Sequence, residues 1–134
     1  GLLTGLTRGT ERGHIARATL DAMALQNADS LGAMQSDLGR KMKPLRVDGG
    51  AAANDLLMQL QADVLGHRLI RPAVIETTVA GACYLAGLGV GIWNNPTEVK
   101  KIWKAEREFS VQMKAPARRR RLASWETALR RTLM

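Results

Sequence analysis

The stretch "RVDGGAAAN" at residues 46–54 joins an apolar, strand-like run to a helix-like one. Two adjacent glycines, Gly49 and Gly50, lie at the junction, and three alanines separate them from Asn54. Glycine tolerates positive φ and allows close approach of the backbone to another group. The start of the following helix presents unpaired N–H groups and a favourable dipole to an anion. The pattern alone therefore fits either a plain tight turn or a site for a phosphate-bearing ligand.

The segments on both sides of this junction predict an α/β fold. Apolar periodicity and stop signals indicate a long helix at about 11–38, a polar connection at 40–44, and a strand at 45–47. A second helix at 54–65, a second strand at 68–71 and a third helix at 76–89 follow. The remaining predictions are a short helix at 95–103, a short strand at 107–111 and a basic helix at about 116–133. This order indicates a small sheet covered by helices.

Two of these helices carry predictions about packing. The helix at 11–38 is apolar on more than one side in its first half, so we expect it to be buried between neighbours. The helix at 76–89 is rich in small residues, including Gly81 and Gly87, which favour close packing against another element. Cys83 lies within it with no base beside it, and we interpret it as a buried packing residue.

Composition limits the classes of function. A chain of 134 residues with 46% hydrophobic and 24% charged residues is typical of one globular domain. One cysteine excludes an internal disulfide framework and favours a reducing, cytoplasmic setting. We find no apolar run long enough for a membrane span.

The net charge of +8 is concentrated in residues 114–134. We interpret this basic tail as a solvated face or a contact with a partner, and nucleic-acid binding is not favoured because stacking aromatic residues are missing around it. The one nearby aromatic residue, Trp125, falls on an apolar stripe with Leu122, Leu129 and Leu133 and is expected to pack inward.

Single polar residues give no catalytic constellation. His14 and His67 lack acidic partners at metal-ligand spacing, so we predict ordinary histidines and no metal site. Asp48 fits either an acid/base group or, at least as well, a side chain bonded to the turn amides. Asn54 fits a helix cap or a ligand contact.

Three longer strings add a family resemblance: "GLTRGTERGHIARATLDAMALQ", "LRVDGGAAANDLLMQLQADVLGHRLIRP" and "ETTVAGACYLAGLGVGIW". Together they resemble the C-terminal region of glycerol kinases, members of the FGGY carbohydrate kinase family, from Gly5 to about Phe109. The resemblance implies an actin-like, ribonuclease H-like fold in which two domains enclose ATP and the sugar alcohol. Residues 1–134 would form a single partial domain, the later part of the second one. The chain begins in a loop at Gly1, and we expect it to be the tail of a larger protein.

The same resemblance implies a function for the glycine stretch. Gly50 and Asn54 match family positions that contact ADP, and Gly49 shares the turn. The family reaction transfers the γ-phosphoryl group of ATP to the 3-hydroxyl of glycerol with Mg²⁺ and a carboxylate base. The base and the glycerol contacts precede the matched segment in the family, so no catalytic residue is expected in this chain, which alone would be inactive. The implied partners are the missing N-terminal kinase domain and further copies in a homo-oligomer.

Departures from the family pattern and two alternatives stay open. Leu25, Val79, Ala80 and Cys83 replace common family residues and are interpreted as packing changes, while the sequence after Phe109 diverges. The first alternative is a non-catalytic remnant or an interaction module that uses the basic tail. The second is a related FGGY sugar kinase that acts on a different substrate.

Overall fold

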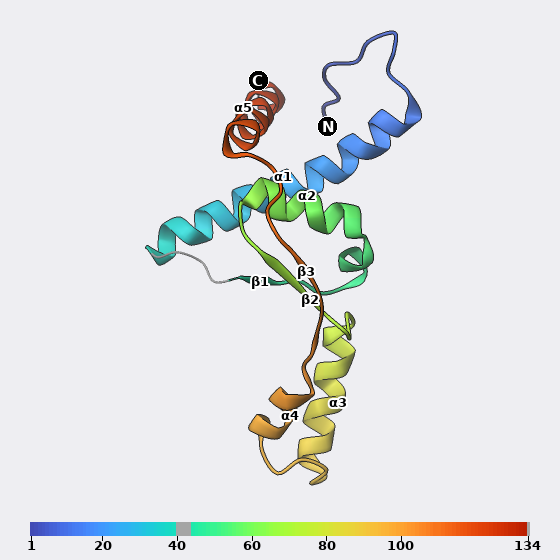
Figure 1. Ribbon diagram of the computed structural model, residues 1–134, viewed down its shortest axis with the longest axis vertical. Coiled ribbons are helices and arrows are strands. Elements are labelled where there is room, and N and C mark those ends of the chain that lie inside the picture. The colour runs from blue at the N-terminus through green and yellow to red at the C-terminus, as the bar shows by residue number, and fades with distance from the viewer. Residues whose placement is uncertain (40–43, 134) are drawn as a thin grey trace.

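The computed structural model describes residues 1–39 and 44–133 and contains a small mixed sheet with helices around it (Figure 1). The strands are β1 (Leu45–Arg46), β2 (Leu69–Pro72) and β3 (Ala105–Phe109). The helices are α1 (Arg12–Leu38), α2 (Asp55–Leu65), α3 (Thr77–Gly89), α4 (Pro96–Ile102) and α5 (Ala115–Thr132), with a short 3₁₀ helix, η1 (Gly50–Ala53), before α2. The α/β class and the order of the elements predicted from the sequence are confirmed, and η1 is an addition.

The three strands lie in the order β1-β2-β3. β1 and β2 run parallel, with Leu45 opposite Leu69, and β2 and β3 run antiparallel, with Leu69 opposite Phe109. The parallel pair requires a crossover, which η1 and α2 provide. The glycine junction therefore lies at the end of β1, where the chain leaves the sheet.

The core forms where α1 and α2 pack together beside the sheet (Figure 1). α2 is the most buried helix, and Leu69 and Val64 are the largest side chains that are fully enclosed. The buried apolar residues are Ala24, Leu25, Ala52, Leu57, Met58, Leu60, Ala62, Val64, Leu69 and Phe109. The core therefore directly supports the segment that follows the glycine junction.

The prediction that α1 is buried between neighbours is wrong for this chain. Its only fully buried residues are Ala24 and Leu25, whereas Ile15 is 42% and Leu38 54% exposed. α2 packs against the middle of α1, and apolar side chains near both of its ends stay exposed. The end of α1 agrees with the sequence, since Gly39 adopts the left-handed conformation of a helix stop. Most of the polar connection predicted at 40–44 lies outside the described residues.

The packing predictions for α3 are partly wrong. Cys83 is exposed rather than buried, because α3 extends away from the sheet and little of the described chain lies against it (Figure 1). A Cβ placed on Gly81 would meet no heavy atom within 4 Å. Gly87 behaves as predicted, since the Trp93 ring packs so closely against it that an added Cβ would lie 2.2 Å from a ring atom.

The basic helix α5 contacts the core through one face. Leu122 and Trp125 pack against the core cluster as the apolar stripe predicts, but Leu133 at the end of the stripe is 86% exposed. The inward packing predicted for Trp125 is therefore confirmed, whereas the end of the stripe extends past the residues it could pack against. No helix in the described ranges combines the length and apolar character needed to cross a membrane.

Candidate functional site

The candidate site is the segment from Asp48 to Asp55, here called the glycine loop. Gly49 has a φ of 79°, a value that favours glycine, and its N–H donates to the Ile75 carbonyl at 2.7 Å. The Asp48 carboxylate accepts a hydrogen bond from the Thr77 hydroxyl. One interpretation of the sequence was that Asp48 bonds to the turn amides. In the structure its side chain instead joins the loop to the start of α3.

The middle of the glycine loop is the 3₁₀ helix η1. The Ala52 N–H donates to the Gly49 carbonyl at 2.9 Å, and the Asn54 N–H donates to the Ala51 carbonyl at 3.2 Å. Within the part of the chain that the structure describes, the N–H groups of Gly50 and Ala51 have no acceptor. A Cβ on Gly50 would meet nothing within 4 Å, so the space beside this residue is open. The arrangement leaves two adjacent donors accessible to a ligand.

Asn54 is the N-cap of α2. Its Oδ1 accepts from the Leu57 N–H at 3.1 Å, which confirms the capping interpretation. The residue is exposed, and its Nδ2 donates to no acceptor among the described residues. Capping therefore occupies the oxygen and leaves the nitrogen as a donor, so a cap and a ligand contact are compatible in the same side chain.

Arg71 supports the glycine loop from β2, and sequence reasoning missed it. Its Nη1 donates to the Ala52 carbonyl at 2.7 Å and to Asp55 Oδ1 at 2.8 Å. Its Nε donates to Glu106 Oε2 on β3, also at 2.8 Å. The side chain is only 10% exposed, and the guanidinium carbon lies 5.4 Å from the centroid of the Phe109 ring. A buried arginine thus joins η1, α2 and β3.

The charge state of Arg71 follows from its partners. The hydrogen bond to Glu106 is the largest influence and raises the pKa of the Arg71 guanidinium above its ordinary value, with Asp55 acting in the same direction. Burial acts in the opposite direction but does not dominate. Arg71 therefore stays charged at any physiological pH. The pattern "RLIRP" alone gave no signal of this role, because Glu106 lies 35 positions along the chain.

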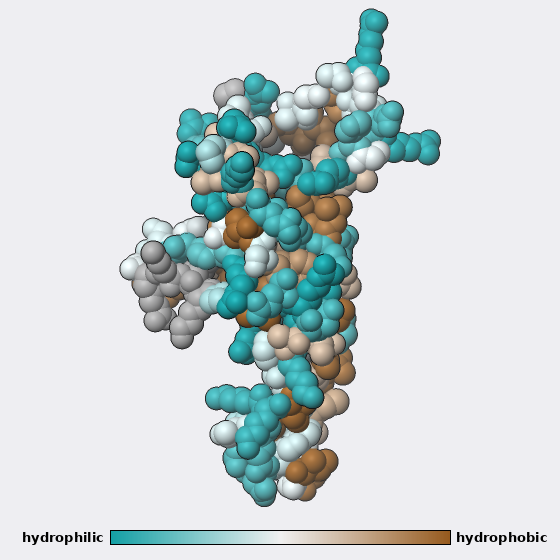
Figure 2. Space-filling view, in the orientation of Figure 1, coloured by the Kyte–Doolittle hydropathy of each residue, from teal (hydrophilic) through white to brown (hydrophobic). Residues whose placement is uncertain are grey.

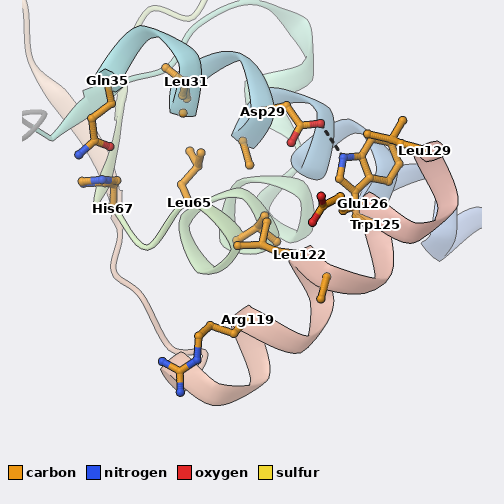
Figure 3. Close-up of a pocket in the computed structure, with 14 residues that line it drawn as sticks. Asp29, Leu31, Gln35, Leu65, His67, Arg119, Leu122, Trp125, Glu126 and Leu129 are labelled. Atoms are coloured by element: carbon orange, nitrogen blue, oxygen red, sulfur yellow. Dashed lines mark hydrogen bonds between the residues drawn. The ribbon is translucent and has the colours of Figure 1, made fainter. Parts of the chain in front are cut away.

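A separate groove of about 700 Å³ lies between α1, the end of α2 and α5 (Figure 3). Leu65, Leu122 and Leu129 line it, and the Trp125 indole N–H donates to Asp29 Oδ2 at 2.6 Å across it. Neither Gly50 nor Asn54 lines this groove. It opens near the end of α2, about 16 Å from Asn54 by the rise of the helix, and is therefore a different surface from the glycine loop.

The remaining candidates make local contacts. His14 Nδ1 accepts from the Glu11 N–H at 3.1 Å in the capping box of α1, and His67 lies half-buried at the rim of the groove. No three His, Cys, Asp or Glu side chains converge as a metal site within residues 1–39 and 44–133. At the glycine loop the structure presents backbone donors at Gly50 and Ala51 and an amide donor at Asn54.

The chain belongs to the FGGY family of carbohydrate kinases, because the sequence model of the family's C-terminal domain matches residues 1–90. The family's actin-like ATPase fold, expected from the sequence, is confirmed by the similarity to solved kinases of the family.

The chain is similar to individual glycerol kinases along nearly its whole length. The chain is 57% identical over 131 residues to a glycerol kinase of Bdellovibrio bacteriovorus and 54% identical over 132 residues to one of Rhodopirellula baltica. These alignments cover 98% of the chain but only 26% and 24% of the relatives. The chain therefore spans about a quarter of the length of the curated relatives it matches.

Solved structures show the same partial coverage. Plasmodium falciparum glycerol kinase with ADP matches with a TM-score of 0.85 and 34% identity, covering 98% of this chain and 26% of that one. Xylulose kinase from Rhodospirillum rubrum matches with a TM-score of 0.74 and 27% identity, covering 97% and 26%. The fold is thus common to kinases of different sugars, and the higher identity lies with glycerol kinases.

Proposed function

We propose that this chain is the C-terminal segment of an ATP-dependent glycerol kinase, which converts ATP and glycerol to ADP and glycerol 3-phosphate. The observation that carries the proposal is the 57% identity to a glycerol kinase along nearly the whole chain. Among the solved structures, the identity is 34% to the Plasmodium glycerol kinase and 27% to the xylulose kinase, which favours glycerol over a pentulose as the substrate.

Within that enzyme, the glycine loop binds the adenine nucleotide through Gly50 and Asn54. Three observations support this role: the Gly50 N–H has no acceptor among the described residues, the space beside it is open, and Asn54 is exposed. The similar Plasmodium enzyme was solved with ADP. Backbone N–H groups and an amide donor suit a nucleotide because its phosphates and ribose offer acceptors.

The contribution of this chain is to orient the nucleotide. Phosphoryl transfer depends on positioning and on neutralising charge rather than on covalent chemistry by the protein, so a fixed loop that places the nucleotide assists the reaction. Mg²⁺ neutralises phosphate charge when bound. The described residues contain no group of three or more His, Cys, Asp or Glu side chains that could hold a metal. The family resemblance assigns the base and the glycerol contacts to other parts of the enzyme.

The proposal implies a partner for the exposed apolar surface. Figure 2 shows apolar surface along the part of the molecule formed by α3 and the turn after it, where Val79, Leu85 and Val90 are each more than 60% exposed. Large apolar patches mark interaction surfaces. The N-terminal kinase domain and further copies of the chain in a homo-oligomer are the proposed partners, in a cytoplasmic enzyme that uses ATP.

The test is an assay that couples ADP release to NADH oxidation. It compares the isolated 134 residues, the chain joined to the N-terminal part of the kinase, and that N-terminal part alone. We expect glycerol-dependent turnover only from the joined protein. Robust turnover by the isolated chain would contradict the division of roles, because the base and glycerol contacts would then have to lie within it.

The two alternatives predict different outcomes of the same assay. A joined protein that phosphorylates xylulose in preference to glycerol would indicate a sugar kinase of different specificity. A joined protein that binds no ADP by calorimetry would indicate a non-catalytic remnant. In the latter case, removal of residues 114–134 followed by a binding assay with acidic partners would examine the basic tail directly.

A further inference from the structure

Both ends of the glycine loop are held by one short stretch of chain, residues 71–77. At the first end, the Ile75 carbonyl accepts from the Gly49 N–H, and the Thr77 hydroxyl donates to Asp48. At the second end, Arg71 contacts the loop. One segment, from Arg71 in β2 to Thr77 at the start of α3, therefore contacts the loop at both ends.

Two arginines form the support at the second end: Arg107 Nη1 on β3 donates to the Asp55 carboxylate, and Arg71 Nη1 has two acceptors in the loop. Arg71 Nη1 donates both to the Ala52 carbonyl at 2.7 Å and to the Asp55 carboxylate at 2.8 Å. These two acceptors flank Asn54, one in η1 and one at the first position of α2. Charge-assisted hydrogen bonds of this length are short and directional. They fix the spacing across the turn from which the Asn54 side chain projects.

The orientation of Arg71 is itself fixed. Its Nε donates a hydrogen bond to Glu106 Oε2 at 2.8 Å, and the Phe109 ring lies beside the guanidinium. A planar guanidinium presents several donors in a rigid arrangement, whereas the ammonium of lysine is a single point on a flexible stem. Lysine at this position keeps the charge but cannot hold Glu106 and both loop acceptors in the same geometry.

We propose that Arg71 is a positioning residue for nucleotide binding: it sets where the Gly50 N–H and the Asn54 side chain lie, without contacting the nucleotide itself. This inference rests on the proposed function of the glycine loop. Small displacements of binding groups have large effects on affinity and rate, so an error in the turn at Asn54 is sufficient to weaken nucleotide binding.

The experiment compares Arg71→Lys with Arg68→Lys in the full-length kinase that carries this chain. Arg68 is a matched control because it lies on the segment leading into β2 and also pairs with a glutamate of β3, Glu108, at 2.9 Å, but it is exposed and does not contact the loop. Calorimetry gives the Kd for ADP, steady-state kinetics give KM for ATP and for glycerol, and thermal unfolding checks the fold.

We expect Arg71→Lys to raise the Kd for ADP and the KM for ATP about tenfold or more, with the KM for glycerol within about twofold of wild type. Arg68→Lys should leave all three within about twofold, because an exposed ion pair contributes little. If Arg71→Lys does not fold, Asp55→Asn takes its place, since it weakens the same bond from the half-exposed partner, together with the bond from Arg107 to Asp55. The expected result for Asp55→Asn is likewise weaker ADP binding with unchanged KM for glycerol.

A double-mutant cycle separates positioning from a general structural role. Combined with Asn54→Ser, Arg71→Lys should weaken ADP binding by less than the product of the two single effects, because both changes act on the same contact. Multiplicative effects, or a parallel loss of glycerol and nucleotide affinity, would overturn the inference. If the wild-type protein binds no ADP, the proposed function is refuted. If the wild type and the folded Arg71 and Asp55 variants all bind ADP normally, only the inference about Arg71 is refuted.

Discussion

The carboxylate of Asp63 accepts a hydrogen bond from the backbone N–H of Gln112 at 2.6 Å. The same oxygen accepts from the Met113 N–H at 2.9 Å, and Asp63 is only 9% exposed. One buried acid at the end of α2 thus satisfies two consecutive backbone donors in the connection between β3 and α5. The contact fixes where the basic helix begins relative to the core.

Removal of this carboxylate should destabilise the protein. Asp63→Ala leaves two backbone donors without their acceptor, and a hydrogen bond to a charged group contributes about 1.5–3 kcal/mol. We expect a lower midpoint in urea unfolding of the full-length protein, while Asp63→Asn, which retains an acceptor oxygen, should lose less. Glu108→Gln is a suitable control, because it removes only an exposed ion pair. Equal midpoints for wild type and Asp63→Ala would show that the connection is held by other contacts.

The two adjacent glycines should respond differently to substitution. Gly50→Val should weaken ADP binding by adding bulk in the open space beside the loop, with little change in unfolding, because an added Cβ meets nothing within 4 Å in this chain. Gly49→Val should destabilise the fold by about 1–3 kcal/mol, because a side chain at a φ of 79° is strained. Calorimetry with ADP and urea unfolding separate the two effects. Unchanged ADP affinity in a folded Gly50→Val protein would count against a role of Gly50 in nucleotide binding.

Asn54 allows the cap and the ligand contact to be tested separately. Asn54→Ala should lose both functions and about 0.5–2 kcal/mol of stability. Asn54→Ser keeps an oxygen that caps α2 but removes the Nδ2 donor, so it should retain stability and still bind ADP more weakly. If Asn54→Ser bound ADP as tightly as wild type, the side chain would be a cap and nothing more.

Gly87 provides a test of packing away from the loop. Gly87→Ala places a Cβ 2.2 Å from an atom of the Trp93 ring, whose edge-to-face contact with Tyr84 has a centroid distance of 5.7 Å. Overpacking of this kind costs about 1–3 kcal/mol. Gly81→Ala on the same helix has open space and should be neutral or slightly stabilising. Unfolding midpoints and tryptophan fluorescence compare the two variants, and similar behaviour would show that the Trp93 ring moves aside freely.

The sequence predicted the helices and strands better than the burial of their side chains. Periodicity located α2 and the stop at Gly66, because a local apolar pattern and a glycine determine both. Periodicity cannot tell whether the chain contains the partner for an apolar face, and this is why the burial expected for Cys83 and α1 was wrong. The chain spans about a quarter of the length of the relatives it matches.

The sequence likewise predicted some residues of the candidate site and missed another. Gly50 and Asn54 were predicted as site residues because they belong to one contiguous motif, and their role in nucleotide binding remains a proposal. Arg71 was missed because its role depends on Glu106 and on the carbonyl of Ala52, which only the folded sheet brings to it. A long-range ion pair leaves no local pattern, whereas a turn does.

The contact of residues 71–77 with both ends of the loop has an evolutionary consequence. The loop and the segment that holds it are close neighbours in sequence, and α5 makes none of the loop's described contacts. Mutations can therefore accumulate in the basic terminal helix without altering the geometry of the loop. Selection on the geometry of the loop should act on Asp48 to Thr77 as one inherited block, with Glu106 and Arg107 as its distant members.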